Sequence, residues 1–314
     1  MYCRKDQERY YRRVLLPLEK NAIRRRNWAR MRRRCALGFA DMRKALRARN
    51  LGRFCRSAKR FINTERQEYG RFRREYRSAE GLSPGTLCFS DQRIAVYTAI
   101  FGRYDTLQEP LFCPDNVDYF VITDGEVRAG SKWIRLPWDG FPQDEPMTDA
   151  DKNRYVKMFP HLLFPSYAYS VYMDGNILVA ADFTPLAMRA ADYPVAMHMH
   201  KDRDCVYEEI DACIEKRKDT PEALSRQRSV LQDLGVPAHW GLLEAPVIAR
   251  RHHDPRCREI MEKWWACYRA GCRRDQIALI RCLWELGIDP RRLGGLGASV
   301  MASNSFIWSA HKRA

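Results

Sequence analysis

The chain has 314 residues, of which 46% are hydrophobic, so it can bury a sizeable core and hold one large domain with an appendage. Its net charge of +16 is concentrated at one end. Residues 1–80 carry 26 of the 55 basic and 8 of the 39 acidic side chains, a net of +18, which leaves 29 basic and 31 acidic side chains and a net of −2 for residues 81–314. No apolar run is long enough to cross a membrane, and the N-terminal residues lack the apolar stretch of a signal peptide. This break in charge predicts a basic helical arm over residues 1–85 and a separate domain over residues 86–314.

The eleven cysteines give a second compositional signal. Their number is odd, and the sequence contains neither a Cys-x-x-Cys pair nor a Cys/His spacing typical of zinc. We therefore expect reduced thiols in a cytoplasmic protein.

The basic arm allows three interpretations. Its arginines are dense, at residues 24–26 and 32–34 for example, while its apolar positions are too sparse for an independent core. Such a segment can dock on an anionic membrane surface or a partner, remain a solvated extension, or bind nucleic acid. Nucleic acid is the least favoured of the three, because no nucleic-acid fold signature accompanies the arm and the domain behind it is not basic. Membrane docking through residues 1–80 would place the protein at the inner membrane surface.

From residue 93 the pattern alternates between strands and helices. Apolar, β-branched and aromatic runs predict strands, and longer periodic segments predict helices. The expected strands cover residues 93–101, 117–123, 132–136, 169–173, 177–179, 194–198 and 246–250, and the expected helices cover residues 149–160, 183–191, 203–217, 221–234, 255–270 and 273–286. This alternation predicts an α/β fold with a mostly parallel sheet flanked by helices and preceded by the basic helical arm. Ligands of such sheets bind beyond the carboxyl ends of the strands.

Several common nucleotide and hydrolase signatures are missing. There is no G-x-G-x-x-G after the first strand, no G-x-x-x-x-G-K-[ST] and no G-x-S-x-G. The sequence therefore disfavours a dinucleotide site, a P-loop kinase and a serine hydrolase of the α/β class.

The most informative stretch is the buried strand 169–173 and the triplet that follows it, Asp174-Gly175-Asn176. Asp174 and Asn176 carry oxygen ligands on either side of a glycine, so both can bind one hard cation such as Mn²⁺ or Mg²⁺. The same triplet is also good turn chemistry, and on its own it does not separate the two interpretations.

Together the motifs resemble those of one glycosyltransferase family, the plant mucilage and TOD-type (HOC-like) glycosyltransferases, which also has bacterial members. The resemblance covers about residues 93–283. Its motifs are Tyr97–Gly102 with Tyr104-Asp105, Thr123-Asp124, Lys157 with Pro160-His161, Tyr172–Asn176, His200 with Arg203–Glu209, Trp264-Trp265, and Arg274-Asp275-Gln276.

The resemblance implies a GT-A fold that binds a nucleotide-sugar donor. The metal motif of such folds is usually Asp-x-Asp, and here Asn176 stands in the third position with one negative charge fewer than an aspartate. His311 occupies the place where many GT-A enzymes supply a last metal ligand. The implied metal ligands are therefore Asp174, Asn176 and His311, with Mn²⁺ or Mg²⁺ as the cofactor.

The departing nucleoside diphosphate needs positive charge. Arg154 and Lys157 lie about one helical turn apart and can face the diphosphate, although an ordinary solvated helix face explains them equally well. By the same resemblance Thr98 and Asp105 are placed to contact the nucleoside and its ribose, with Asp124 near the base. The expected donor-binding residues also include Gly102, His200 and Arg203. His200 could bind a metal or a phosphate, or be a structural histidine after a strand.

The motif Arg274-Asp275-Gln276 gives the expected catalytic residues. Asp275 can contact the acceptor hydroxyl or the donor sugar as a base or an orienting group. It also stands at the start of an apolar helix, where an acid can simply be a cap.

The predicted function is the transfer of a sugar from a nucleotide-sugar donor to a polysaccharide or lipid-linked acceptor, assisted by a divalent metal. Two alternatives belong to other classes: a metal-dependent hydrolase on the same scaffold, and a non-catalytic module whose basic arm binds nucleic acid.

Overall fold

The computed structural model describes residues 93–180, 183–191, 193–200, 202–297, 299–300, 303 and 305–308, together with scattered positions between 39 and 58. Those scattered positions are helical apart from Ala48, in agreement with the helical character predicted for this segment. The remainder of the predicted arm, residues 1–85, lies outside the described residues. Residues 88–179 and 183–314 make up one compact unit. No helix within the described ranges is long and apolar enough to cross a membrane.

The centre of this unit is a six-stranded sheet with the strand order β3-β2-β1-β4-β7-β6, and a two-stranded sheet joins β5 to β8. The strands are β1 (Ile94–Ile100), β2 (Val117–Thr123), β3 (Trp133–Arg135), β4 (Tyr169–Met173), β5 (Ile177–Val179), β6 (Val195–Met199), β7 (Leu243–Arg250) and β8 (Phe306–Trp308). In the larger sheet β3, β2, β1 and β4 are mutually parallel, and β7 runs antiparallel to both β4 and β6. The predicted α/β fold with a mostly parallel sheet is therefore confirmed.

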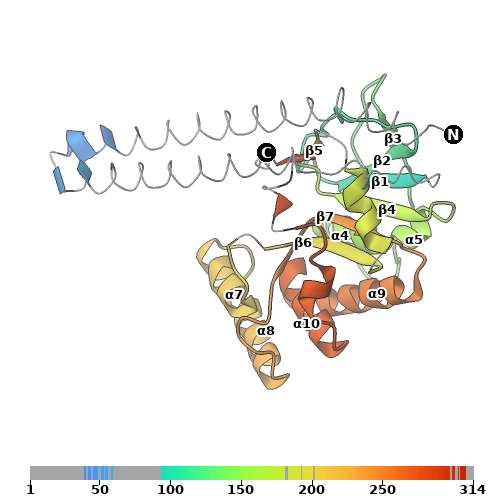
Figure 1. Cartoon of the computed structure of the whole chain (residues 1–314). Helices are drawn as coiled ribbons and strands as arrows, with labels where there is room; N and C mark the ends of the chain where they lie inside the picture. The colour runs from blue at the N-terminus through green and yellow to red at the C-terminus, as the bar shows by residue number, and fades with distance from the viewer. Residues whose placement is uncertain are drawn as a thin grey trace, which may run out of the picture. The chain divides into compact units, whose positions relative to one another are not determined.

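Helices alternate with the strands along the chain. They are α4 (Asp149–Met158), α5 (Pro160–Leu163), α6 (Thr184–Ala187), η3 (Met188–Ala191), α7 (Val206–Glu215), α8 (Pro221–Asp233), α9 (Pro255–Ala270), α10 (Asp275–Glu285) and η4 (Pro290–Leu293). Of these, α4, α9 and α10 pack against the sheet, whereas α7 and α8 project away from it and share an apolar cluster with α10 (Figure 1). Two expectations need adjustment. The strand predicted at 246–250 begins at Leu243, because the added residues pair with β6 beyond a bulge at Met197/His198. The helix predicted at 183–191 changes to a 3₁₀ helix at Met188.

The two faces of the sheet bury separate apolar clusters, as the alternation of side chains along a strand requires. On β1, Ala95, Tyr97 and Ala99 join the cluster of α4, α9 and α10. Ile94 and Val96 point to the other face and join the cluster that contains β5, α6 and β8. All described cysteines are free, and most of them are buried, as expected for reduced thiols.

Helix α4 begins with a capping box that continues into a buried ionic network. Thr148 is the N-cap, and its hydroxyl accepts a hydrogen bond from the backbone N–H of Asp151. The Asp151 carboxylate is 2% exposed and accepts hydrogen bonds from the Thr148 backbone at 3.1 Å, the Tyr268 hydroxyl at 3.0 Å and Arg273 Nη1 at 3.2 Å. Burial opposes its ionisation, but the hydrogen bonds from Thr148 and the charge of Arg273 lower its pKa. One carboxylate thus ties the start of α4 to α9 and to the loop before α10.

We predict that Asp151→Ala lowers the free energy of unfolding at pH 7 by roughly 1–3 kcal/mol, because it leaves the buried Tyr268 hydroxyl and the Thr148 backbone N–H without their hydrogen-bond acceptor. The pKa of Asp151 is lowered by folding, so its contribution is complete above the ordinary value of 3.8 and disappears as pH falls through the lowered value. Urea unfolding measures the change. The control is Asp211→Ala, which breaks an exposed pair with Arg228 and should cost less than about 1 kcal/mol. Equal losses in both variants would contradict the buried-network interpretation.

Candidate active site

A cavity of about 590 Å³ opens at one edge of the large sheet, where the carboxyl ends of the parallel strands meet. It is lined by residues at and after the end of β1 (100–102 and 104–105), after β4 (174–175) and after β6 (His200). Strand β7 runs in the opposite direction, so its first residues, 244–246, reach the same edge. Helix α4 and the start of α10 complete the wall. The site therefore lies where an open α/β sheet binds its ligands.

The loop after β1 is fixed by the end of the neighbouring strand. Gly102 has a positive φ of 61°, and its backbone N–H donates to Asp124 Oδ2 at 3.0 Å. A side chain at Gly102 would also overlap the carboxylate of Asp149. Asp124 does not line the cavity itself. In this structure it holds the loop that carries Tyr104 and Asp105 into the cavity.

The turn after β4 packs tightly against the same loop. Gly175 does not adopt a positive φ, so its conformation is open to other residues. A Cβ at this position would lie 2.8 Å from Ile100 Cγ1 and 3.1 Å from Asp105 Cβ. Glycine is needed here because the turn approaches β1 closely, and this approach sets the position of Asp174 in the cavity.

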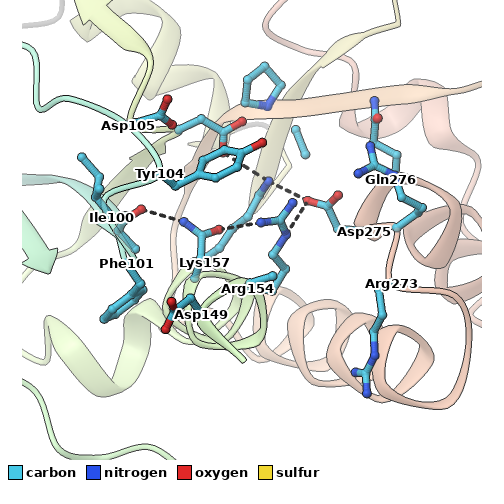
Figure 2. Close-up of a pocket in the computed structure, with 18 of the residues that line it drawn as sticks. Ile100, Phe101, Tyr104, Asp105, Asp149, Arg154, Lys157, Arg273, Asp275 and Gln276 are labelled. Atoms are coloured by element: carbon cyan, nitrogen blue, oxygen red, sulfur yellow. Dashed lines mark hydrogen bonds and ion pairs between the residues drawn. The ribbon is translucent and has the colours of Figure 1, made fainter. Parts of the chain in front are cut away.

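The floor of the cavity holds a cluster of two cations and two carboxylates (Figure 2). Lys157 is 2% exposed, and its Nζ lies 2.9 Å from Asp275 Oδ2 and 3.7 Å from Asp174 Oδ1. Arg154 Nε lies 3.7 Å from the same oxygen of Asp275. The solvated-face interpretation of Arg154 and Lys157 is wrong, because both point inward from α4 to the carboxylates. The carboxylates of Asp275 and Asp174 therefore compensate the charge of the buried Lys157 ammonium.

Asp275 is the first residue of α10, and Arg274 is the N-cap, which has no side-chain cap hydrogen bond. The capping interpretation of Asp275 is therefore wrong; its carboxylate binds Lys157 instead. Burial opposes its ionisation, but the charges of Lys157, Arg154 and Arg274 hold its pKa far below the ordinary range. A general base works best with a pKa near the operating pH, so this geometry suits an orienting group better than a base.

A second layer of side chains positions Lys157 from behind; Tyr97 and Trp264 in this layer belong to quoted motifs, whereas Arg250 does not. The backbone carbonyl of Lys157 accepts hydrogen bonds from Arg250 Nη1 at 2.6 Å and from the Tyr97 hydroxyl at 3.1 Å. Arg250 is fully buried and also donates to the Tyr97 hydroxyl. Trp264 Nε1 donates to the backbone carbonyl of Asp275 at 2.8 Å. The ion pair is thus fixed at the backbone of both partners.

Asn153 and Tyr172 fix the opposite side of the cluster. Asn153 Nδ2 donates to the Ala99 carbonyl at 2.6 Å, and the Tyr172 hydroxyl donates to Asp174 Oδ1 at 3.0 Å. The ring of Tyr172 lies 5.1 Å from Lys157 Nζ. Burial and the charge of Asp174 raise the pKa of Tyr172 well above its ordinary value, so it stays a neutral donor.

The structure brings most of the predicted site residues together. Those that line the cavity are Gly102, Asp105, Arg154, Lys157, Asp174, His200, Arg274, Asp275 and Gln276. His200 Nδ1 accepts from the backbone N–H of Arg203 at 3.0 Å, and Gln276 Nε2 donates to the Leu243 carbonyl at 3.2 Å.

The other predicted residues lie away from the cavity surface or outside the described residues. Thr98 is buried within β1 and Asn176 is buried after β4, and neither lines the cavity. Arg203 pairs with Glu209, with Nε 2.8 Å from Oε2. Their roles in binding a donor stay predictions, as does that of His311, which the structure does not describe.

The predicted metal ligands fit a divalent cation poorly. Asp174 faces the cavity, but its Oδ1 already accepts from Tyr172 and lies near the ammonium of Lys157. Asn176, 3% exposed, does not join it at the cavity surface. Within the described ranges no group of three His, Cys, Asp or Glu side chains is arranged to hold a metal ion.

Several cavity residues were not among the predicted site residues. They are Ile100, Tyr104, Asp149, Asn153, Lys218, Glu244, Arg273 and Trp308. Ile100 and Tyr104 lie in the first quoted motif, which did not show that the Tyr104 side chain is 53% exposed. The other six lie outside the quoted motifs and had no local signal that separated them from surface residues.

Comparison with known proteins agrees with the predicted resemblance. Residues 141–287 match the family model described as TOD1/MUCI70, glycosyltransferase-like domain, which confirms the resemblance seen in the motifs. Among solved structures the chain is similar to the WbbM bifunctional glycosyltransferase in its apo form, with 12% sequence identity and a TM-score of 0.39. This likeness covers 63% of the present chain and only 38% of that chain. No curated protein matches the sequence.

We predict that Gly175→Ala displaces Ile100 and Asp105 and costs about 1–3 kcal/mol of stability, as overpacking of a close contact does. Because the same contact positions Asp174, activity should fall as well. Gly125→Ala is the matched control, since its new Cβ would lie 3.4 Å from Thr123 Oγ1, close to ordinary contact. Thermal unfolding of both variants measures the effect, and an unchanged Gly175→Ala variant would show that the turn has room to move.

Proposed function

We propose that this protein transfers a sugar from a nucleotide-sugar donor to a polysaccharide or lipid-linked acceptor. The glycosyltransferase-like match over residues 141–287 supports a glycosyltransferase in general. The observation that carries the finer proposal is the buried cluster of Lys157, Arg154, Asp275 and Asp174 at the floor of a cavity large enough for a ligand.

In this proposal the two ends of the cavity bind different parts of the substrates. Figure 2 shows Ile100 and Asp105, from the end of β1, on one side of Lys157, and Asp275 and Gln276, from the start of α10, on the other. We assign the nucleoside to the β1 side, where Asp105 can accept a hydrogen bond from a ribose hydroxyl. The diphosphate then lies over Arg154 and Lys157, and the sugar and acceptor lie towards Asp275.

Asp275 acts in this proposal by orienting cations rather than by accepting a proton. Its carboxylate holds Lys157 and Arg154 in place before the donor arrives, so the positive charge needs no rearrangement when the diphosphate leaves. The metal assistance predicted from Asp174, Asn176 and His311 stays a prediction, and no step of this proposal passes through a metal ion.

The proposal is tested with purified full-length protein and nucleoside diphosphates. UDP or GDP should raise the melting temperature, because a ligand at about 100 times its Kd adds roughly 2.7 kcal/mol to the stability of the native state. The corresponding nucleosides, which lack the diphosphate, should have little effect at the same concentration. Release of nucleotide from a nucleotide sugar with and without a glycan acceptor then separates a transferase from a hydrolase. If neither diphosphate shifts the melting temperature, the proposal is wrong.

We predict that Asp275→Asn lowers turnover by roughly two to three orders of magnitude, the range for loss of one preorganised electrostatic contact. The amide keeps the shape of the side chain but removes the charge that orients Lys157. Asp289→Asn is the control, since Asn also caps a helix and Asp289 caps η4 without lining the cavity. Steady-state kinetics with a nucleotide sugar provides the measurement, and near-normal turnover of Asp275→Asn would remove Asp275 from the mechanism.

The proposed location of the protein is argued from the sequence alone. The net charge of +18 over residues 1–80 favours a cytoplasmic protein that is held at an anionic membrane surface, where lipid-linked acceptors are found. Each basic residue near such a surface contributes about 1 kcal/mol, and salt screens the attraction.

We therefore predict that the full-length chain sediments with anionic vesicles at low salt and is released as salt rises. Neutral vesicles are the control and should not retain it. Equal retention by both kinds of vesicle would contradict the electrostatic part of this prediction.

A further inference from the structure

The cation that faces a donor diphosphate in this cavity belongs to the chain itself. Lys157 Nζ is 2.9 Å from Asp275 Oδ2 and 3.7 Å from Asp174 Oδ1, so the ammonium stands between two carboxylates. Asp174 is the residue that a divalent ion would need as its first ligand. Its Oδ1 instead contacts a phenol and an ammonium, those of Tyr172 and Lys157.

The neighbours of Lys157 are placed to stabilise a positive charge at Nζ. Burying an ammonium costs several kcal/mol, which the two carboxylates offset only with good geometry. The rings of Tyr172 and Trp264 lie 5.1 and 5.9 Å from Nζ, where their faces favour a cation. A lysine needed only for packing could be replaced by an apolar side chain of similar length at no such cost.

The cluster also leaves donors for a ligand. An ammonium has three N–H donors, and the hydrogen bond to Asp275 uses one of them. Arg154, one turn earlier on α4, offers a planar guanidinium that can bind two phosphate oxygens at once. Its Nη1 donates to Asn153 Oδ1 at 3.2 Å, which fixes the plane of the group. Lys157 and Arg154 together can therefore contact a diphosphate without rearrangement.

We propose that Lys157, with Arg154, supplies the positive charge that a divalent ion would otherwise bring to the diphosphate of the donor. This inference rests on the proposed function. In the transfer step the bond between the anomeric carbon and the diphosphate oxygen breaks, and its electron pair stays on that oxygen beside Lys157 and Arg154. The acceptor oxygen forms the new bond to the anomeric carbon, and its proton is released to water.

The proposal reverses the expected effect of one substitution. If Asp174 were a metal ligand, Asp174→Asn would weaken the binding of a nucleoside diphosphate. If Asp174 is instead a counter-charge for Lys157, it repels the diphosphate, and its neutralisation leaves affinity unchanged or strengthens it by about threefold or more. The amide is close in size to the carboxylate and can still accept the hydrogen bond from Tyr172, so the fold should be retained.

The experiment measures the affinity of the full-length chain for UDP and GDP by calorimetry, once with EDTA and once with Mn²⁺. We expect at least one nucleotide to bind in EDTA with a Kd within about threefold of the value in Mn²⁺. Lys157→Met should weaken that binding at least tenfold, and Lys157→Arg should restore part of it. The control is Lys263→Met on α9, since Lys263 pairs with Glu285 and neither residue lines the cavity.

Three outcomes are decisive. Equal or tighter binding by Asp174→Asn in EDTA supports the proposal, even if Lys157→Met fails to fold. Binding that needs Mn²⁺ and is lost in Asp174→Asn overturns it while leaving the nucleotide-sugar function intact. If neither UDP nor GDP binds wild-type protein under either condition, the proposed function fails, and the inference fails with it.

Discussion

The buried ion pair between Lys157 and Asp275 is the interaction on which the site depends. It joins α4 to the first residue of α10, two helices that are 118 positions apart in the chain at these residues. Burying either charge without the other would cost several kcal/mol, so the two helices have to meet in one register. The Arg250 and Tyr97 bonds to the Lys157 carbonyl extend this constraint into β7 and β1. The fold and the electrostatics of the cavity are therefore fixed by the same contacts.

The direction of the strands explains why these residues can meet at all. The loops after β1 and β4 emerge at one edge because the two strands are parallel, and β7 brings its amino end to that edge because it is reversed. Gly102 and Gly175 then allow the two loops to approach their neighbours more closely than a side chain would permit. Asp105 and Asp174 face one cavity as a result.

The sequence predicted the sheet well because its strands are short apolar runs with clear ends. It also singled out three residues that line the cavity: Asp174 at a strand end, Asp275 at a helix start and Lys157 in the last turn of α4. It could not show which neighbours would compensate these charges. Asn176 illustrates the limit: its position two residues after Asp174 suggested a shared ligand, but the turn buries it. Spacing along a chain does not give the side-chain direction after a turn.

Arg250 illustrates the complementary limit. In the sequence it is an arginine at the end of a predicted strand, a position that is usually solvated. In the structure it is fully buried, and it donates to a backbone carbonyl of α4 and to a tyrosine of β1. These two oxygen partners lie 93 and 153 positions away in the chain, so no local pattern could reveal them. The sequence therefore does not reveal the long-range compensation of charge, which in the structure holds the motif residues together around one cavity.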